Sequence, residues 1–149
     1  MAPIVVDIMR LPHAKGLPLP EYATSHASGV DLVAAIERDI TIFPECHKVI
    51  PTGISVAVPE GYEIQIRPRS GLAARHRLTV LNTPGTIDAD YRGELHVLLI
   101  NLSDRLFVVE RGMRIAQAVL APIMRITWQE VLILPETPRG TGGLGSTGV

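Results

Sequence analysis

Apolar and polar residues alternate with a period of two in short stretches that proline and glycine separate. In residues 52–67 the alternation continues on both sides of Pro59-Glu60-Gly61, which predicts a β-hairpin closed by that turn. Similar apolar stretches elsewhere predict further short strands. The strands predicted in this way cover residues 3–9, 30–36, 39–43, 52–58, 62–67, 78–81, 95–101, 106–109, 114–120 and 123–134.

One short helix is expected from Ser70 to Arg75, with Ser70 as its N-cap. Many short strands with frequent turn residues and a single short helix indicate an all-β sandwich, jelly roll or barrel. A length of 149 residues suits one domain with one hydrophobic core.

Composition excludes several classes of protein. The 14 Lys and Arg residues nearly balance 15 Asp and Glu residues, and aromatic residues make up 4% of the chain, so nucleic-acid binding is not expected. The single cysteine, Cys46, cannot form an internal disulfide, and the five histidines lack metal-ligand spacing. No apolar run reaches the length of about 18 residues that spans a membrane. We therefore expect a soluble cytoplasmic protein without a membrane partner.

The glycine-rich end of the chain, residues 135–149, is expected to be flexible. A G-x-G-x-x-G pattern starts at Gly140, but a dinucleotide-binding site would need a strand before it and a helix after it. The backbone N–H groups, the hydroxyls of Ser146 and Thr147 and the cation of Arg139 suit a wrap around a phosphate chain.

Two other segments carry candidate chemistry for a phosphate substrate. Arg69 lies beside the start of the predicted helix, where the amides of Ser70 and Gly71 could hold an anion, although helix capping alone would also explain Ser70. In the strand 114–120, Gln117 is a polar residue among apolar ones; contact at a sheet edge or between subunits is its simpler explanation.

A pair of acids, Asp88 and Asp90, follows the turn at Pro84-Gly85. On a strand, residues two apart point to the same face, so one carboxylate could activate water while the other pairs with Arg92. Taken singly, either aspartate is more often a turn or surface residue.

Together, five segments in order resemble the five motifs of the trimeric dUTP pyrophosphatases (dUTPases). They are residues 27–32, 69–73, 85–94, 112–117 and 139–148. The resemblance implies a jelly-roll, β-clip-like homotrimer with active sites between subunits, built from a β-domain (1–134) and a flexible lid (135–149). It also implies Mg²⁺-dependent hydrolysis of dUTP to dUMP and pyrophosphate, which keeps dUTP low and supplies dUMP for thymidylate synthesis. The Mg²⁺ is expected on phosphate oxygens and water rather than on protein ligands.

The resemblance also implies roles for individual residues. Asp88 matches the carboxylate that activates the attacking water, and Tyr91 matches the ring beneath the deoxyribose. Asp31 is expected to support either the water shell of the metal or the Arg69 loop. The other implied substrate contacts are Asn82, Thr86 and Ile87 for uracil, Arg69, Ser70, Gly71 and Gln117 for the α- and β-phosphates, and Arg139, Gly145, Ser146 and Thr147 for the γ-phosphate.

Two positions differ from the family pattern. Leu144 stands where many relatives have an aromatic residue that stacks on uracil, and Met113 stands where an acid is common.

Two alternative functions fit the same sequence. A dCTP deaminase shares the architecture but lacks the glycine-rich fifth motif, and a noncatalytic nucleotide-binding trimer would retain the motifs without turnover.

Overall fold

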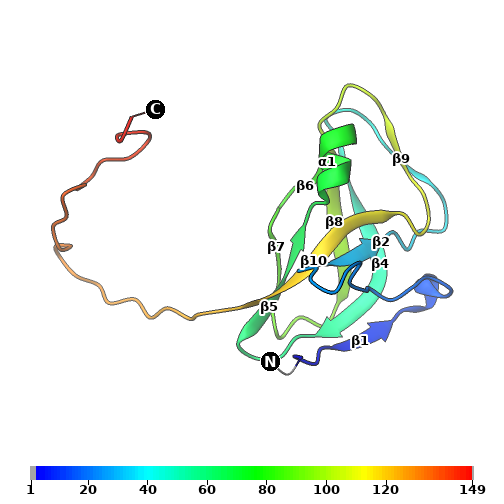
Figure 1. Ribbon diagram of the computed structural model, residues 1–149, viewed down its shortest axis with the longest axis horizontal. Helices are drawn as coiled ribbons and strands as arrows, with labels where there is room; N and C mark the ends of the chain where they lie inside the picture. The colour runs from blue at the N-terminus through cyan, green and yellow to red at the C-terminus, as the bar shows by residue number, and fades with distance from the viewer. Residues whose placement is uncertain (1–2, 149) are drawn as a thin grey trace.

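The computed structural model describes residues 3–148, and most of its secondary structure is short antiparallel strands (Figure 1). The single α-helix among these residues, α1, is Ser70–His76, and a 3₁₀ turn, η1, is Pro12–Ala14. The strands are β1 (Asp7–Arg10), β2 (Val30–Val33), β3 (Ile40–Ile42), β4 (His47–Ala57), β5 (Tyr62–Arg67), β6 (Leu78–Val80), β7 (Gly85–Ile87), β8 (Glu94–Asn101), β9 (Phe107–Val109) and β10 (Arg114–Pro122).

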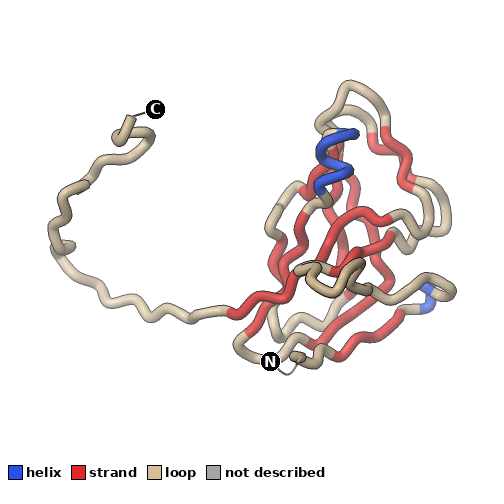
Figure 2. The backbone as a smooth tube through the Cα atoms, in the orientation of Figure 1, coloured by secondary structure: helices blue, strands red, loops and turns tan. Residues whose placement is uncertain are grey.

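Two four-stranded sheets form the layers of a sandwich, in the orders β1-β4-β8-β6 and β2-β10-β5-β7. Strands β3 and β9 form a separate two-stranded ribbon, and α1 lies at the same end of the molecule (Figures 1 and 2). Between the sheets lies the core of buried aliphatic side chains, which include Leu32, Ile66, Val97, Leu99 and Ile115. The prediction of an all-β jelly roll is confirmed.

The predicted hairpin across Pro59 is wrong, although the turn itself is present. Tyr62 donates its backbone N–H to the carbonyl of Pro59, yet β4 pairs with β1 and β8 while β5 pairs with β10 and β7. Both strands carry alternating apolar residues because both bury one face in the core between the sheets. Pro59 cannot donate to a β-ladder, and the strands diverge into opposite layers.

Other boundaries differ from the predictions in informative ways. Residues 123–134 form no strand, because the single chain offers them no neighbouring strand to pair with. Strand β7 is absent from the predicted strands, since three residues that begin with the glycine of the Pro84-Gly85 turn carry little pattern. Ser70 is the first helical residue and Arg69 occupies the N-cap without a side-chain cap bond, so the capping role expected for Ser70 is wrong.

Beyond β10 the chain leaves the sandwich and extends into solvent (Figure 1). Its large apolar residues stay exposed, and Trp128 retains 87% of its accessible surface. No helix within residues 3–148 is long and apolar enough to cross a membrane.

Candidate active site

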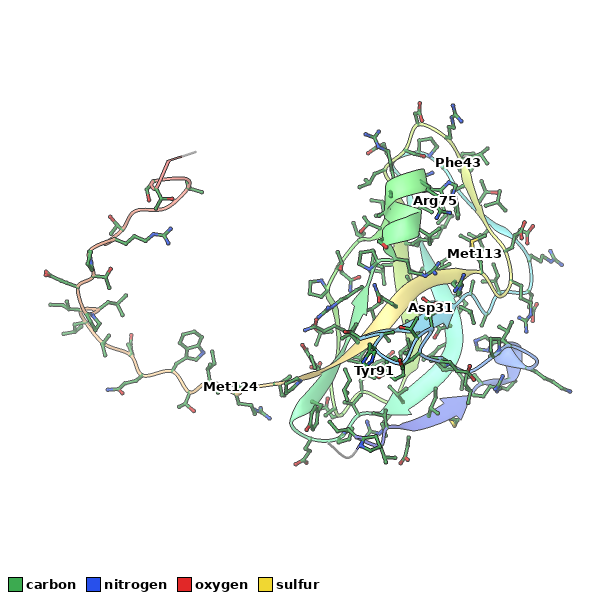
Figure 3. The ribbon with its side chains drawn as sticks, in the orientation of Figure 1. Asp31, Phe43, Arg75, Tyr91, Met113 and Met124 are labelled. Atoms are coloured by element: carbon green, nitrogen blue, oxygen red, sulfur yellow. The ribbon has the colours of Figure 1, made fainter. Side chains whose placement is uncertain are left out.

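Polar side chains meet on the outer face of the sheet β2-β10-β5-β7. In the strand register, Gln117 of β10 lies between Asp31 of β2 and Arg67 of β5. Directly opposed residues of antiparallel strands point to the same face, so these three side chains share the solvent side of the sheet. The opposite face, with Leu32 and Ile66, is buried in the core. Figure 3 labels Asp31 on this sheet.

The carboxylate of Asp31 holds two arginines at this surface. Arg69 Nε donates to Asp31 Oδ1 at 2.9 Å, and Arg114 Nη1 donates to Oδ2 at 3.2 Å. Each ion pair is partly exposed, so its main effect is on the position of the guanidinium groups rather than on stability. Of the two roles expected for Asp31, this contact supports the one at the Arg69 loop. Arg114 was missed in the sequence, although it lies in the same segment as Gln117.

A cavity of about 380 Å³ opens beside these residues. Gln117 closes one side of it, where its Nε2 donates to the carbonyl of Pro68 at 3.0 Å. The structure thus brings together the expected α- and β-phosphate contacts of two segments that are distant in sequence, beside Asp31 of a third segment. The lining residues are Ala23, Ala27, Ser28, Gly29, Asp31, Arg69, Ser70, Gly71, Arg114 and Gln117.

The expected uracil and water contacts lie elsewhere, at the edge strand β7. Thr86 and Ile87 pair with Gln65 and Ile64 of β5, and the side chain of Asn82 lies against Gly85 at the start of β7. The expected uracil contacts Asn82, Thr86 and Ile87 therefore lie together around β7 and the turn before it.

Asp88 follows β7 directly and is exposed. The expectation that Asp88 and Asp90 share a strand face is wrong, because residues 88–91 form a turn in which Tyr91 donates its N–H to the Asp88 carbonyl at 3.1 Å. Arg92 closes this turn by donating to the carbonyls of Ala89 at 2.6 Å and Tyr91 at 2.9 Å, rather than to a carboxylate. The turn leaves the carboxylate of Asp88 facing solvent.

A second cavity, of about 700 Å³, contains Asp88 and is separate from the first. Its lining residues are Glu60, Gly61, Asp88, Ala89, Asp90, Ile123 and Arg125, none of which lines the cavity beside Asp31. Within one chain, the structure therefore does not bring Asp88 into the cavity of Arg69 and Gln117.

Tyr91 lies close to Asp88, at the other end of the same turn. Tyr91 is 41% exposed, and its hydroxyl donates to the Glu94 carbonyl at 2.9 Å. This bond tethers the outer end of the ring to the first residue of β8 and leaves part of the ring open to a ligand.

The expected contacts in the tail remain apart from both cavities. Arg139 donates from Nε to the carbonyl of Gly142 at 2.8 Å, and Leu144, Gly145, Ser146 and Thr147 are exposed. Neither cavity has a lining residue from the tail beyond Arg125.

The chain offers no cage for a metal ion within residues 3–148, where no three His, Cys, Asp or Glu side chains gather around one point. The carboxylate nearest the cationic cavity, Asp31, already pairs with two arginines. A divalent ion here would take its oxygen ligands from a bound phosphate chain and from water, an arrangement that suits Mg²⁺.

Comparison with known proteins gives a consistent family assignment. The chain is 58% identical over 149 residues, the whole of both chains, to the deoxyuridine 5'-triphosphate nucleotidohydrolase of Rickettsia prowazekii (strain Madrid E). It is 57% identical over 144 residues to the protein of that name from Rickettsia rickettsii (strain Sheila Smith), covering 97% of each. Among solved structures, the Staphylococcus bacteriophage 80alpha dUTPase with dUpNHpp is similar, with a TM-score of 0.85 and 26% identity over 97% of this chain and 99% of that one. Because the dUTPase family model also matches residues 15–148, which include all the segments around both cavities, the chain belongs to the dUTPase family.

Proposed function

We propose that this chain hydrolyses dUTP to dUMP and pyrophosphate. The observation that carries the proposal is an exposed carboxylate, Asp88, on a chain that also builds a cavity with Arg69, Arg114 and Gln117 at its wall. The names of the Rickettsia relatives and the dUpNHpp in the phage enzyme support dUTP as substrate. The reaction keeps dUTP low and supplies dUMP for thymidylate synthesis. We place it in the cytoplasm, consistent with the free cysteine Cys46.

In the mechanism we propose, Asp88 orients a water molecule and takes its proton as the water attacks the α-phosphorus. An oxygen–phosphorus bond forms while the bond from the α-phosphorus to the bridging oxygen breaks, and pyrophosphate leaves. Arg69, Gln117 and the amides of Ser70 and Gly71 hold the α- and β-phosphates. Fixing the phosphates in line with the water and neutralising their charge account for most of the catalysis. Mg²⁺, when bound with the substrate, would add to that neutralisation.

Selectivity for dUTP comes from the residues around β7. Asn82 and the backbone at Thr86 and Ile87 pair with the edge of uracil. Cytosine would present a donor where these groups need an acceptor, and the methyl group of thymine would collide with the turn. Tyr91 lies beneath the deoxyribose and leaves no room for a 2′-hydroxyl.

A homotrimer with shared sites is the assembly that we propose. Three features support it: Asp88 and Arg69 lie in separate cavities of one chain, the tail extends away from both, and large apolar residues are exposed at the surface. Val49 of β4 is 54% exposed, Leu81 is exposed just after β6, and Trp128 is exposed in the segment beyond β10. Closed three-fold assembly would cover apolar surface and bring cavities of different chains together.

The tail then acts as a lid over a site that other chains provide. Arg139, Gly145, Ser146 and Thr147 would close on the γ-phosphate with charge-assisted and backbone hydrogen bonds. Leu144 would lie near uracil, where an aliphatic side chain offers apolar contact but no stacking face.

Pyrophosphate release from separate dUTP, dTTP, dCTP and UTP reactions, with and without Mg²⁺, tests this function. We expect dUTP to be hydrolysed far faster than the other three, and EDTA to suppress the reaction. Equal rates for dUTP and dCTP would overturn the assignment, and nucleotide binding without release of pyrophosphate would indicate a noncatalytic protein.

Replacing Leu144 with phenylalanine should strengthen lid closure. A stacked ring contributes about 0.5–1.5 kcal/mol, so KM for dUTP should fall by a factor of roughly 2 to 13. Steady-state kinetics of the full-length variant would measure the change, with Leu144→Ala as the matched control that adds no ring. An unchanged KM in Leu144→Phe would mean that the lid closes through its phosphate contacts alone.

A further inference from the structure

Glu94, the first residue of β8, accepts several hydrogen bonds and has no role in the proposed hydrolysis. Its Oε1 accepts the backbone N–H of Gly53 at 2.8 Å and lies 2.5 Å from Nε2 of His13. Carboxylate oxygens accept hydrogen bonds, so the His13 ring donates from Nε2. Oε2 faces Nε2 of His96 at 3.6 Å. The Glu94 side chain is only 17% exposed, which makes its hydrogen bonds to Gly53 and His13 stronger than those of an exposed carboxylate.

A bulge in β4 explains why this carboxylate is needed. The pairing of β4 with β8 shifts register between Pro51 and Ser55, and Gly53 lies inside the shift with φ +69°. A Cβ at Gly53 would approach Ala14 Cβ to 2.3 Å, so only glycine fits. The shift removes the ladder partner that Gly53 N–H would otherwise have, and Glu94 replaces it.

The bulge also brings the N-terminal segment to Glu94. Leu11 donates its N–H to the Gly53 carbonyl at 2.8 Å, which places η1 and its His13 beside the start of β8. Three segments that are distant in sequence therefore converge on one carboxylate: η1, the bulge of β4 and the first residue of β8.

The backbone of the same residue holds Tyr91. The Glu94 carbonyl accepts the Tyr91 hydroxyl at 2.9 Å and lies 3.0 Å from Nδ1 of His96, which donates because a carbonyl only accepts. The Tyr91 ring lies over Gly93, where a Cβ would come within 2.5 Å of the tyrosine hydroxyl oxygen. The position of the ring thus depends on the backbone of Gly93 and Glu94, which the Glu94 carboxylate ties to the bulge.

We propose that Glu94, held by His13 and Gly53, is a positioning residue that fixes the Tyr91 ring and thereby sets discrimination between deoxyribo- and ribonucleotides. The inference rests on the proposed function. A ring held at its hydroxyl excludes a 2′-hydroxyl, whereas a ring that can rotate away leaves space for one. Exclusion of a group by shape requires that the excluding side chain be rigid.

The test is the ratio of kcat/KM for dUTP to kcat/KM for UTP. We expect Glu94→Ala to lower the ratio by about tenfold, since a displaced ring admits UTP. Glu94→Gln keeps an oxygen for Gly53 and His13 and offers an amide N–H to His96, so its ratio should stay within about twofold of the unmodified protein. Glu110→Ala, an exposed glutamate-to-alanine change after β9, is the matched control and should leave the ratio unchanged.

A purely structural role for Glu94 would reduce both activities by the same factor, and an unchanged ratio in Glu94→Ala would overturn the proposal. If Glu94→Ala does not fold, His13→Ala and Tyr91→Phe interrupt the same connection at its two ends. Both should then lower the ratio, and an unchanged ratio in both would overturn the proposal. If the unmodified protein does not hydrolyse dUTP, the proposed function itself is wrong. If the unmodified protein hydrolyses dUTP and Glu94→Ala still prefers dUTP over UTP to the same extent, only the positioning role of Glu94 is wrong.

Discussion

Replacing Asp88 with asparagine should reduce kcat for dUTP by a factor of about 10²–10⁴, the range that a positioned general base contributes. Asparagine keeps the size of the side chain and can still orient water, but it cannot take the proton. The exposed turn that carries Asp88 is closed by backbone bonds and by Arg92, so the substitution should leave the fold intact. Pyrophosphate release would measure kcat, and KM should change little.

Asp90 provides the matched control, since it lies in the same turn and lines the same cavity. Asp90→Asn removes an identical charge two residues away and should retain most of the activity. If Asp88→Asn remains active while Asp90→Asn does not, Asp90 is the base. If both variants remain active, another group activates the water.

Mixing two inactive variants should restore about a quarter of the activity. One variant is Asp88→Asn, and the other is truncated after Pro138 and lacks the lid. If a site takes Asp88 from one chain and its lid from another, each intact part is present half of the time in randomly assembled equal mixtures, so about one site in four is complete. Each variant alone should be nearly inactive.

The mixture must be unfolded and refolded together so that chains exchange, and mass spectrometry with one tagged variant would verify mixed trimers. Each variant refolded alone is the control. No recovery in verified mixed trimers would mean that Asp88 and residues 139–148 act within one chain. A stable monomer with full activity would exclude the shared site.

Local pattern was sufficient for most of the fold but not for strand pairing. The alternation in residues 52–67 marks two strands correctly, because each strand buries one face. The same alternation is expected whether the two strands pair in one sheet or face each other across the core, so the pattern does not predict the pairing. For the same reason residues 123–134 have a strand-like sequence and no strand in a single chain, because a strand needs a partner as well as a pattern.

The sequence by itself determined the all-β class, the family resemblance and the identity of the candidate site residues, since these depend on residue types and their order along the chain. Only the tertiary structure decided which residues meet. Asp31 holds Arg69 and Arg114, and Glu94 joins His13 to the carbonyl that Tyr91 contacts. These contacts depend on strand register and on a bulge in β4. Register leaves no local signal in the sequence, and Gly53 marks the bulge without showing which segments meet there, because both contacts arise from the packing of segments far apart in the chain.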